Sequence, residues 1–110
     1  MIALVIALGM TGAAPAAPVP PTLQRKNLGM CFNKVVGDKM SDKLAEDAFK
    51  AAATTACAAE ESKFRDSWVS YEVGMKTKRA DAEENANSQI NDYLQNAVET
   101  YVESVKPPKS

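Results

Sequence analysis

Proline is absent from the long middle part of this chain, and that absence constrains the fold more than any other feature. All six prolines lie near the two ends, as Pro15, Pro18, Pro20, Pro21, Pro107 and Pro108. Because proline breaks helices and is excluded from central strands, residues 22–106 are free to form long regular elements. Alanine is abundant there, glycine is scarce, and no strand-like alternation appears. The 110 residues therefore predict one small all-α domain.

The N-terminus has the pattern of an export signal. Residues 1–10 read MIALVIALGM, an apolar run too short to span a bilayer, and Ala14-Pro15-Ala16 forms an A-x-A cleavage site. The prolines that follow favour an extended linker over a buried strand. No Lys or Arg precedes the apolar run, which leaves an uncleaved anchor or a misplaced start codon as alternatives.

These features predict four segments. Residues 1–16 are interpreted as a signal peptide, 17–21 as a proline-rich linker, 22–105 as the folded domain and 106–110 as a disordered tail. The mature chain would begin at Ala17 and contain no membrane-spanning segment. We therefore expect the protein in the periplasm or outside the cell.

Apolar spacing within the domain predicts three helices, of which the first is short. It extends from Thr22, as N-cap, to Val36, with Gly37 as C-cap. The third begins between Thr77 and Ala80 and ends near Val105. The first helix has the apolar face Leu28, Cys31, Phe32 and Val35, and the third has the stripe Ala82, Ala86, Ile90, Leu94, Val98, Tyr101 and Val105.

The second predicted helix is long. It begins after Ser41, as N-cap, covers residues 42–73 and stops at Gly74. A rod of that length measures about 48 Å, so a kink near Thr54-Thr55 is an alternative. Its expected apolar stripe comprises Leu44, Ala48, Ala52, Thr55, Ala56, Cys57, Phe64, Trp68 and Tyr71.

The two cysteines, Cys31 and Cys57, predict a structural disulfide in an exported chain. Two buried free thiols are the alternative. Cys57 lies about 24 Å along its helix from Ser41, whereas Cys31 lies only about 9 Å from Gly37. The bond therefore requires a stretched connector, a wide crossing angle or a bend in the second helix.

The composition argues against catalysis and against nucleic-acid binding. The chain has no His, which removes Ser-His-Asp and Cys-His mechanisms and His-containing zinc sites. The net charge of −1 leaves no basic footprint for nucleic acid. The acidic groups Glu60-Glu61 and Asp81-x-Glu83-Glu84 lie along single helices and are expected to be solvated faces rather than paired catalytic carboxylates. We expect a protein that is not an enzyme, with no cofactor and no metal.

Two adjoining groups of residues are candidates for binding a partner protein. The first is the aromatic stripe Phe64, Trp68 and Tyr71 with Met75, which is expected to build the core, with Trp68 largely buried; a groove that receives a partner's helix or an unfolded segment is the alternative. The second is the basic cluster Lys76, Lys78 and Arg79, which is expected to be a solvated loop that caps the preceding helix; contact with an anionic group is the alternative.

Charge is segregated between the first and third helices. Arg25, Lys26 and Lys34 give the first helix +3, and six acids with no base give residues 81–103 a charge of −6. We predict that these two helices pack against each other with complementary fields. The alternative is that the third helix presents an acidic surface to a basic partner.

The segment CAAEESKFR, from Cys57 to Arg65, together with Cys31 and the Ala-rich helix, resembles small exported two-cysteine helical proteins of alphaproteobacteria. The size and single cysteine pair also resemble periplasmic acid-stress chaperones. No functional residue carries over from either group. These observations favour a non-enzymatic envelope protein that binds another protein; a stress chaperone that exposes its aromatic stripe on acidification and a carboxylate-dependent enzyme are the alternatives.

Overall fold

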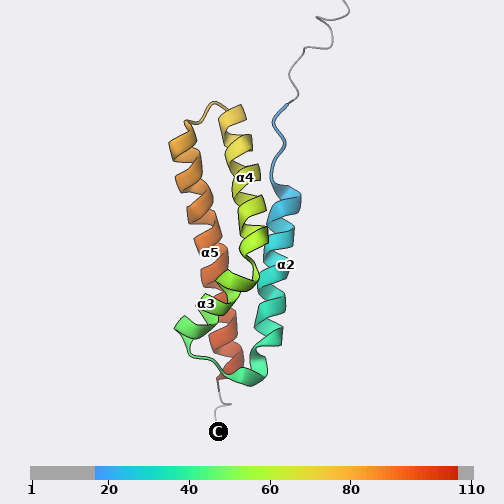
Figure 1. Cartoon of the computed structure of the whole chain (residues 1–110), viewed down its shortest axis with the longest axis vertical. Helices are drawn as coiled ribbons and strands as arrows, with labels where there is room; N and C mark the ends of the chain where they lie inside the picture. Colours follow the sequence, from blue (N-terminus) through green and yellow to red (C-terminus); the bar gives the residue numbers. More distant parts are fainter. Residues whose placement is uncertain (1–16, 107–110) are drawn as a thin grey trace, which may run out of the picture.

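The computed structural model describes residues 17–106, and every regular element in that range is helical. The elements are α2 (Thr22–Asp38), the short 3₁₀ helix η1 (Met40–Asp42), α3 (Glu46–Ala56), α4 (Ala58–Gly74) and α5 (Arg79–Val105) (Figure 1). The all-α prediction is confirmed. The predicted signal peptide, and the tail beyond Lys106, lie outside the described residues.

The predicted single helix over 42–73 is wrong, because the chain forms two helices there and four in all over the described residues. The break is at Cys57, just after the expected kink at Thr54-Thr55. Cys57 belongs to the hydrogen bonding of both helices, since its N–H donates to the Ala53 carbonyl of α3 and its carbonyl accepts the Glu61 N–H of α4. The helix axis turns at this residue (Figure 1). A bend in the second helix is thus how the chain meets the geometric requirement of the disulfide.

Three of the predicted helix ends also differ. Pro21 rather than Thr22 is the N-cap of α2, because its carbonyl accepts the Arg25 N–H. The helix continues past Gly37 to Asp38. Ser41 lies in η1 and does not cap α3, which begins only after Ala45. The stop at Gly74 and both ends of α5 are confirmed.

A buried tyrosine fixes the connector between α2 and α3. Tyr101 is fully buried, and its hydroxyl donates to the Lys39 carbonyl at 2.6 Å and accepts from the Leu44 N–H at 2.9 Å. Lys43 adopts a left-handed conformation (φ 49°) within this connector. The C-terminal part of α5 therefore satisfies two backbone groups that the turn leaves without helical partners.

The main core lies where α2, α3, α4 and α5 meet. The stripe predicted for α5 is buried from Ala82 to Tyr101, and Val105 is half-buried at its end. On α3 the buried positions are Phe49 and Ala53 rather than the expected Ala48 and Ala52. The core cluster comprises Leu28, Phe32, Val35, Val36, Phe49, Ala53, Cys57, Phe64, Ile90, Leu94, Ala97, Val98 and Tyr101.

The predicted packing of the first and third helices is confirmed as contact between α2 and α5. The two helices run in the same direction, with α3 and α4 completing the bundle (Figure 1). The ion pairs of the described chain are all local, Lys34–Asp38, Lys39–Asp42 and Lys106–Glu103. Apolar contact, rather than ion pairing across the interface, therefore holds α2 against α5.

The upper end of the bundle is thinner than the lower end. There α4 and α5 extend beyond the start of α2 and pack on a second, smaller cluster of Val69, Ala82 and Ala86 (Figure 1). The linker residue Pro18 lies against Gly74, where an added Cβ would come within 2.9 Å of the Pro18 Cγ. Glycine at that position lets the linker approach the end of α4 closely.

Candidate binding surfaces

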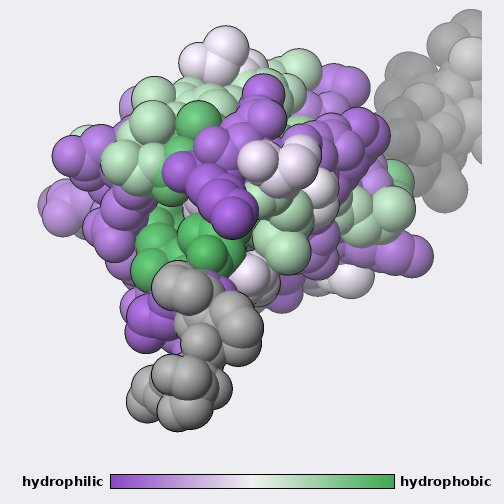
Figure 2. All heavy atoms as spheres, turned by 90° about the horizontal axis from the view of Figure 1, so that it is seen from below, coloured by the Kyte–Doolittle hydropathy of each residue, from purple (hydrophilic) through white to green (hydrophobic). Residues whose placement is uncertain are grey.

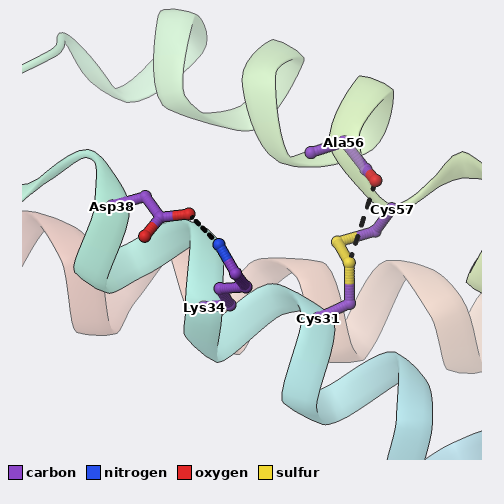
Figure 3. Close-up of a disulfide and its surroundings, with 5 residues drawn as sticks. All are labelled: Cys31, Lys34, Asp38, Ala56 and Cys57. Carbon is purple, nitrogen blue, oxygen red and sulfur yellow. Dashed lines mark hydrogen bonds and ion pairs between the residues drawn. A yellow bond between two sulfur atoms is a disulfide. The ribbon is translucent and has the colours of Figure 1, made fainter.

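The disulfide between Cys31 and Cys57 joins the middle of α2 to the break between α3 and α4 (Figure 3). The Cα atoms are 5.9 Å apart, and Cys57 is fully buried. The Cys31 Sγ lies 3.9 Å from the Ala56 carbonyl oxygen, which is a contact and not a hydrogen bond, because a disulfide sulfur carries no proton. The predicted cross-link is confirmed, and the alternative of two free thiols is excluded.

The predicted aromatic stripe does not form one accessible surface. Phe64 is fully buried, with its ring centroid 5.7 Å from that of Trp68 and 5.8 Å from that of Tyr93. Trp68 is only half-buried, less than predicted, and its indole N–H donates to Glu72 Oε1 at 2.8 Å. Phe64 thus belongs to the core and cannot touch a partner of the folded chain.

The remaining predicted binding residues gather at the turn between α4 and α5. Tyr71 is half-buried, while Met75 is 57% exposed beside Lys76, which has a left-handed backbone (φ 75°). Lys78 is the N-cap residue of α5, and Arg79 lines a groove between α4 and α5. That groove also carries Asp66 and Glu83, so its bases and acids offset each other.

A more apolar groove, which the sequence did not predict, lies between α2 and α4. It has a volume of about 560 Å³ and is lined by Leu23, Gln24, Asn27, Met30, Cys31, Lys34, Glu60 and Lys63. Leu23 and Met30 are 62% and 59% exposed, and they lie two helical turns apart on α2. Their spacing of seven residues could have indicated a second apolar face of α2, but only the face that is buried was predicted from the sequence.

The charge around this groove, which we call the α2–α4 groove, is mainly basic. Lys34 and Lys63 line it together with one acid, Glu60. Lys34 also forms an ion pair with Asp38 at 2.6 Å, one turn along the same helix (Figure 3). The groove therefore combines two large exposed apolar side chains with two lysines at its edges, one of which is paired with Asp38.

The lower end of the bundle shows some apolar surface among hydrophilic residues (Figure 2). The hydrophobic side chains from the connector and the end of α5 are Leu44, Val102 and Val105, which are half-buried, and Met40, which is 39% exposed. Leu44, Val102 and Val105 pack on the main core, so this surface is the edge of the core and not a separate groove.

One carboxylate, Glu61, has an unusual environment. Its Oε2 atom is buried and has no hydrogen-bond partner among the described residues. Burial raises the pKa of Glu61, and the nearby Arg65 guanidinium offsets part of that rise. Arg65 itself is turned toward α5, where its Nε donates to Asn87 Oδ1 at 2.8 Å.

This environment predicts that Glu61→Gln stabilises the protein at pH 7. Because the folded-state pKa is raised, protonation of Glu61 favours the folded chain, and that contribution is lost as the pH rises through the folded-state pKa. The side chain is only partly buried and solvent screens its charge, so the gain should be only about 0.5 kcal/mol. Urea denaturation at pH 7 and pH 4 should show a stabilised variant at pH 7 and equal stabilities at pH 4.

The matched control for that measurement is Glu60→Gln, which removes the same charge one residue away. If both variants change stability by the same amount, the effect belongs to net charge and not to the buried oxygen. A destabilised Glu61→Gln at pH 7 would contradict the prediction.

The acidic residues of α5 are not assembled into a metal site. Asp81, Glu83 and Glu84 are exposed, and residues 17–106 contain no group of three or more carboxylate or cysteine side chains that could hold a metal ion. Within the same range no helix is long and apolar enough to cross a membrane. Comparison of the chain with protein-family models, with curated proteins and with solved structures gives no match.

Proposed function

We propose that this chain is a non-enzymatic binding protein of an oxidising, extracytoplasmic compartment, and that the α2–α4 groove receives a segment of another envelope protein. The observation that carries the proposal is the pair Leu23 and Met30, two large apolar side chains left mostly exposed in one groove. Exposed apolar side chains gathered in a groove mark interaction sites on folded proteins.

The disulfide supports both the compartment and the site. Structural disulfides persist in oxidising compartments and are rare in the cytosol. Here the bond joins α2 to the start of α4, the two helices that form the walls of the groove, and Cys31 is one of its lining residues. A cross-link at this position keeps the groove preformed, which lowers the ordering cost of binding.

The chemistry of the groove selects the partner segment. Side chains two turns apart on one helix fit an amphipathic helix whose apolar residues have the same spacing. Lys34 and Lys63 favour acidic residues at the edges of that helix. The partner is therefore an amphipathic helical segment with acidic flanks.

Replacing both apolar side chains, as Leu23→Gln with Met30→Gln, should abolish capture of the partner and leave the melting temperature unchanged within about 2 °C. The side chains are mostly exposed, so little core packing is lost. A photo-crosslinking amino acid at position 23 or 30 should give an adduct in envelope extract, and the double substitution introduced beside a crosslinker at Gln24 should remove it.

Met40→Gln is the matched control, because Met40 is an exposed methionine at the other end of α2. It should keep both stability and crosslinking. An adduct that persists in the double variant contradicts the proposal. So does an adduct whose mass is twice that of the chain, since the groove would then serve self-association.

The acid-activated chaperone has less support. Such a protein needs an apolar surface that is released at low pH, whereas the fully buried Phe64 ties the aromatic stripe into the main core. The raised pKa of Glu61 acts in the opposite direction, because protonation there favours the folded chain.

A further inference from the structure

A second groove lies on another side of α2, between α2 and α5. It has a volume of about 260 Å³. Its floor is apolar and consists of the buried Phe32 and Ala97. Its edges carry hydrogen-bonding side chains, Asn33, Asn96 and Thr100 among them. An apolar floor with a few polar groups at the edge is the usual composition of a small-molecule site.

Charge distinguishes this groove from the two grooves described above. Arg25 is its one charged lining residue. In residues 17–106 no carboxylate lies within ion-pair distance of the Arg25 guanidinium, which is placed 5.9 Å from the centre of the Trp68 ring. The α2–α4 groove and the groove beside Arg79, by contrast, each contain acids as well as bases. A lone cation above an apolar floor fits an anionic head group attached to an apolar body.

Two amide side chains of the groove are also available. The described structure gives Asn33 and Asn96 no side-chain hydrogen bond, whereas the Thr100 hydroxyl donates to the Asn96 carbonyl of its own helix. Eight residues separate Arg25 from Asn33, which places the two ends of the groove about 12 Å apart. The groove thus extends over about two turns of α2, with its charged residue at one end.

A glycine keeps the groove open. Gly29 lies inside α2, where glycine costs about 1 kcal/mol relative to alanine. A Cβ built at Gly29 meets nothing within 4 Å, so the packing of the fold does not require glycine there. Gly29 lines the groove. Any side chain at this position would project into the space that a ligand would occupy.

We propose that the α2–α5 groove binds a small amphiphilic monocarboxylate, with its carboxylate on the Arg25 guanidinium and its alkyl or aryl part over Phe32 and Ala97. The guanidinium offers two parallel N–H donors to a carboxylate. The amides of Asn33 and Asn96 line the groove beside the alkyl or aryl part. This site is separate from the α2–α4 groove, so either proposal can fail without the other.

Octanoate is the probe, and Trp68, the single tryptophan of the chain, is the reporter beside Arg25. Titration with octanoate should change the Trp68 fluorescence saturably, with a Kd in the millimolar range or below. The side-chain amide resonances of Asn33 and Asn96 should shift in the same titration. Octanol, which has the same chain without the charge, should bind at least tenfold more weakly.

Two pairs of variants separate binding from folding. Arg25→Gln should weaken octanoate binding at least tenfold, measured by the amide resonances, while Lys26→Gln, which removes the neighbouring charge, should not. Gly29→Leu should abolish binding, while Gly37→Leu should not, although both glycines of α2 have open space at the Cβ position. If Gly29→Leu fails to fold, Gly29→Ala provides the same test with a single methyl group.

Several results would overturn the proposal. They are equal binding of octanol and octanoate, unchanged affinity in Arg25→Gln, unchanged affinity in a folded Gly29→Leu, and amide shifts confined to residues outside the groove. The proposal would also be overturned if octanoate caused no saturable change in the Trp68 fluorescence or in the amide resonances.

Discussion

Removal of the disulfide, as Cys31→Ala with Cys57→Ala, is expected to lower the free energy of unfolding by about 3 kcal/mol. The bond closes a loop with a sequence separation of 26 residues, and the loop-entropy estimate for that length gives this magnitude. For a domain of this size the melting temperature should fall by about 12–24 °C. Thermal and urea denaturation of the two proteins, with mass spectrometry to confirm the bond in the wild type, provide the measurement.

Chemical reduction of the wild type is the matched control, because it opens the same loop and keeps both sulfur atoms in place. The double alanine variant should be somewhat less stable than the reduced wild type, since Cys57 is fully buried and its truncation leaves a cavity. A reduced protein that melts within about 2 °C of the oxidised one would show that the bond contributes little.

Phe49→Ala is expected to destabilise the protein by about 3–5 kcal/mol, more than any surface substitution in the bundle. Phe49 is fully buried, and its ring stacks on that of Tyr101 with the centroids 4.1 Å apart. Its loss removes the contact that holds α3 against α5. Urea denaturation followed by circular dichroism should show the reduced stability.

Two further variants provide the comparison, because both are expected to destabilise the protein less than Phe49→Ala. Tyr101→Phe keeps the ring stack but leaves the Lys39 carbonyl and the Leu44 N–H without their partner, which should cost about 1–3 kcal/mol. Met40→Ala, at an exposed position nearby, should change stability by less than about 0.5 kcal/mol. Equal effects of Phe49→Ala and Met40→Ala would mean that α3 does not depend on its aromatic contact.

The elements of the fold that could be predicted from the sequence are those with a regular apolar spacing over many residues. The stripe of α5 has one strong pattern over many turns, so its buried face follows from spacing alone. Its contact with α2 was predicted from the opposite charges of the two helices, although no ion pair joins them in residues 17–106. The middle of the chain was harder. The expected stripe assumed a continuous helix through Cys57, and this assumption placed the face of α3 one residue early, at Ala48 instead of Phe49. With a bend at Cys57, the i, i+4 series Phe49, Ala53 and Cys57 gives the correct face.

The helix ends and the binding surface depend on tertiary contacts that a single sequence does not display. The connector is fixed by Tyr101, which lies 57 residues beyond Leu44, and this contact replaces a local cap at Ser41. The aromatic stripe was predicted as core with a partner groove as the alternative; Phe64 does lie in the core, whereas Trp68 is only half-buried. Leu23 and Met30 were not predicted as binding residues because they lie away from the buried face of α2.

The two apolar clusters imply that the bundle does not open uniformly. Above the start of α2, α4 and α5 are held together by a cluster whose buried members are Val69 and two alanines, so little apolar area is exposed when this end separates. Near the disulfide, separation requires loss of the main core. Backbone amides around the turn at Lys76 should therefore exchange with solvent through local fraying, while the Cys57 N–H, which donates to the Ala53 carbonyl within the main core, should exchange only through global unfolding. The basic residues Lys78 and Arg79 thus lie on the part of the molecule whose shape can change without loss of the fold.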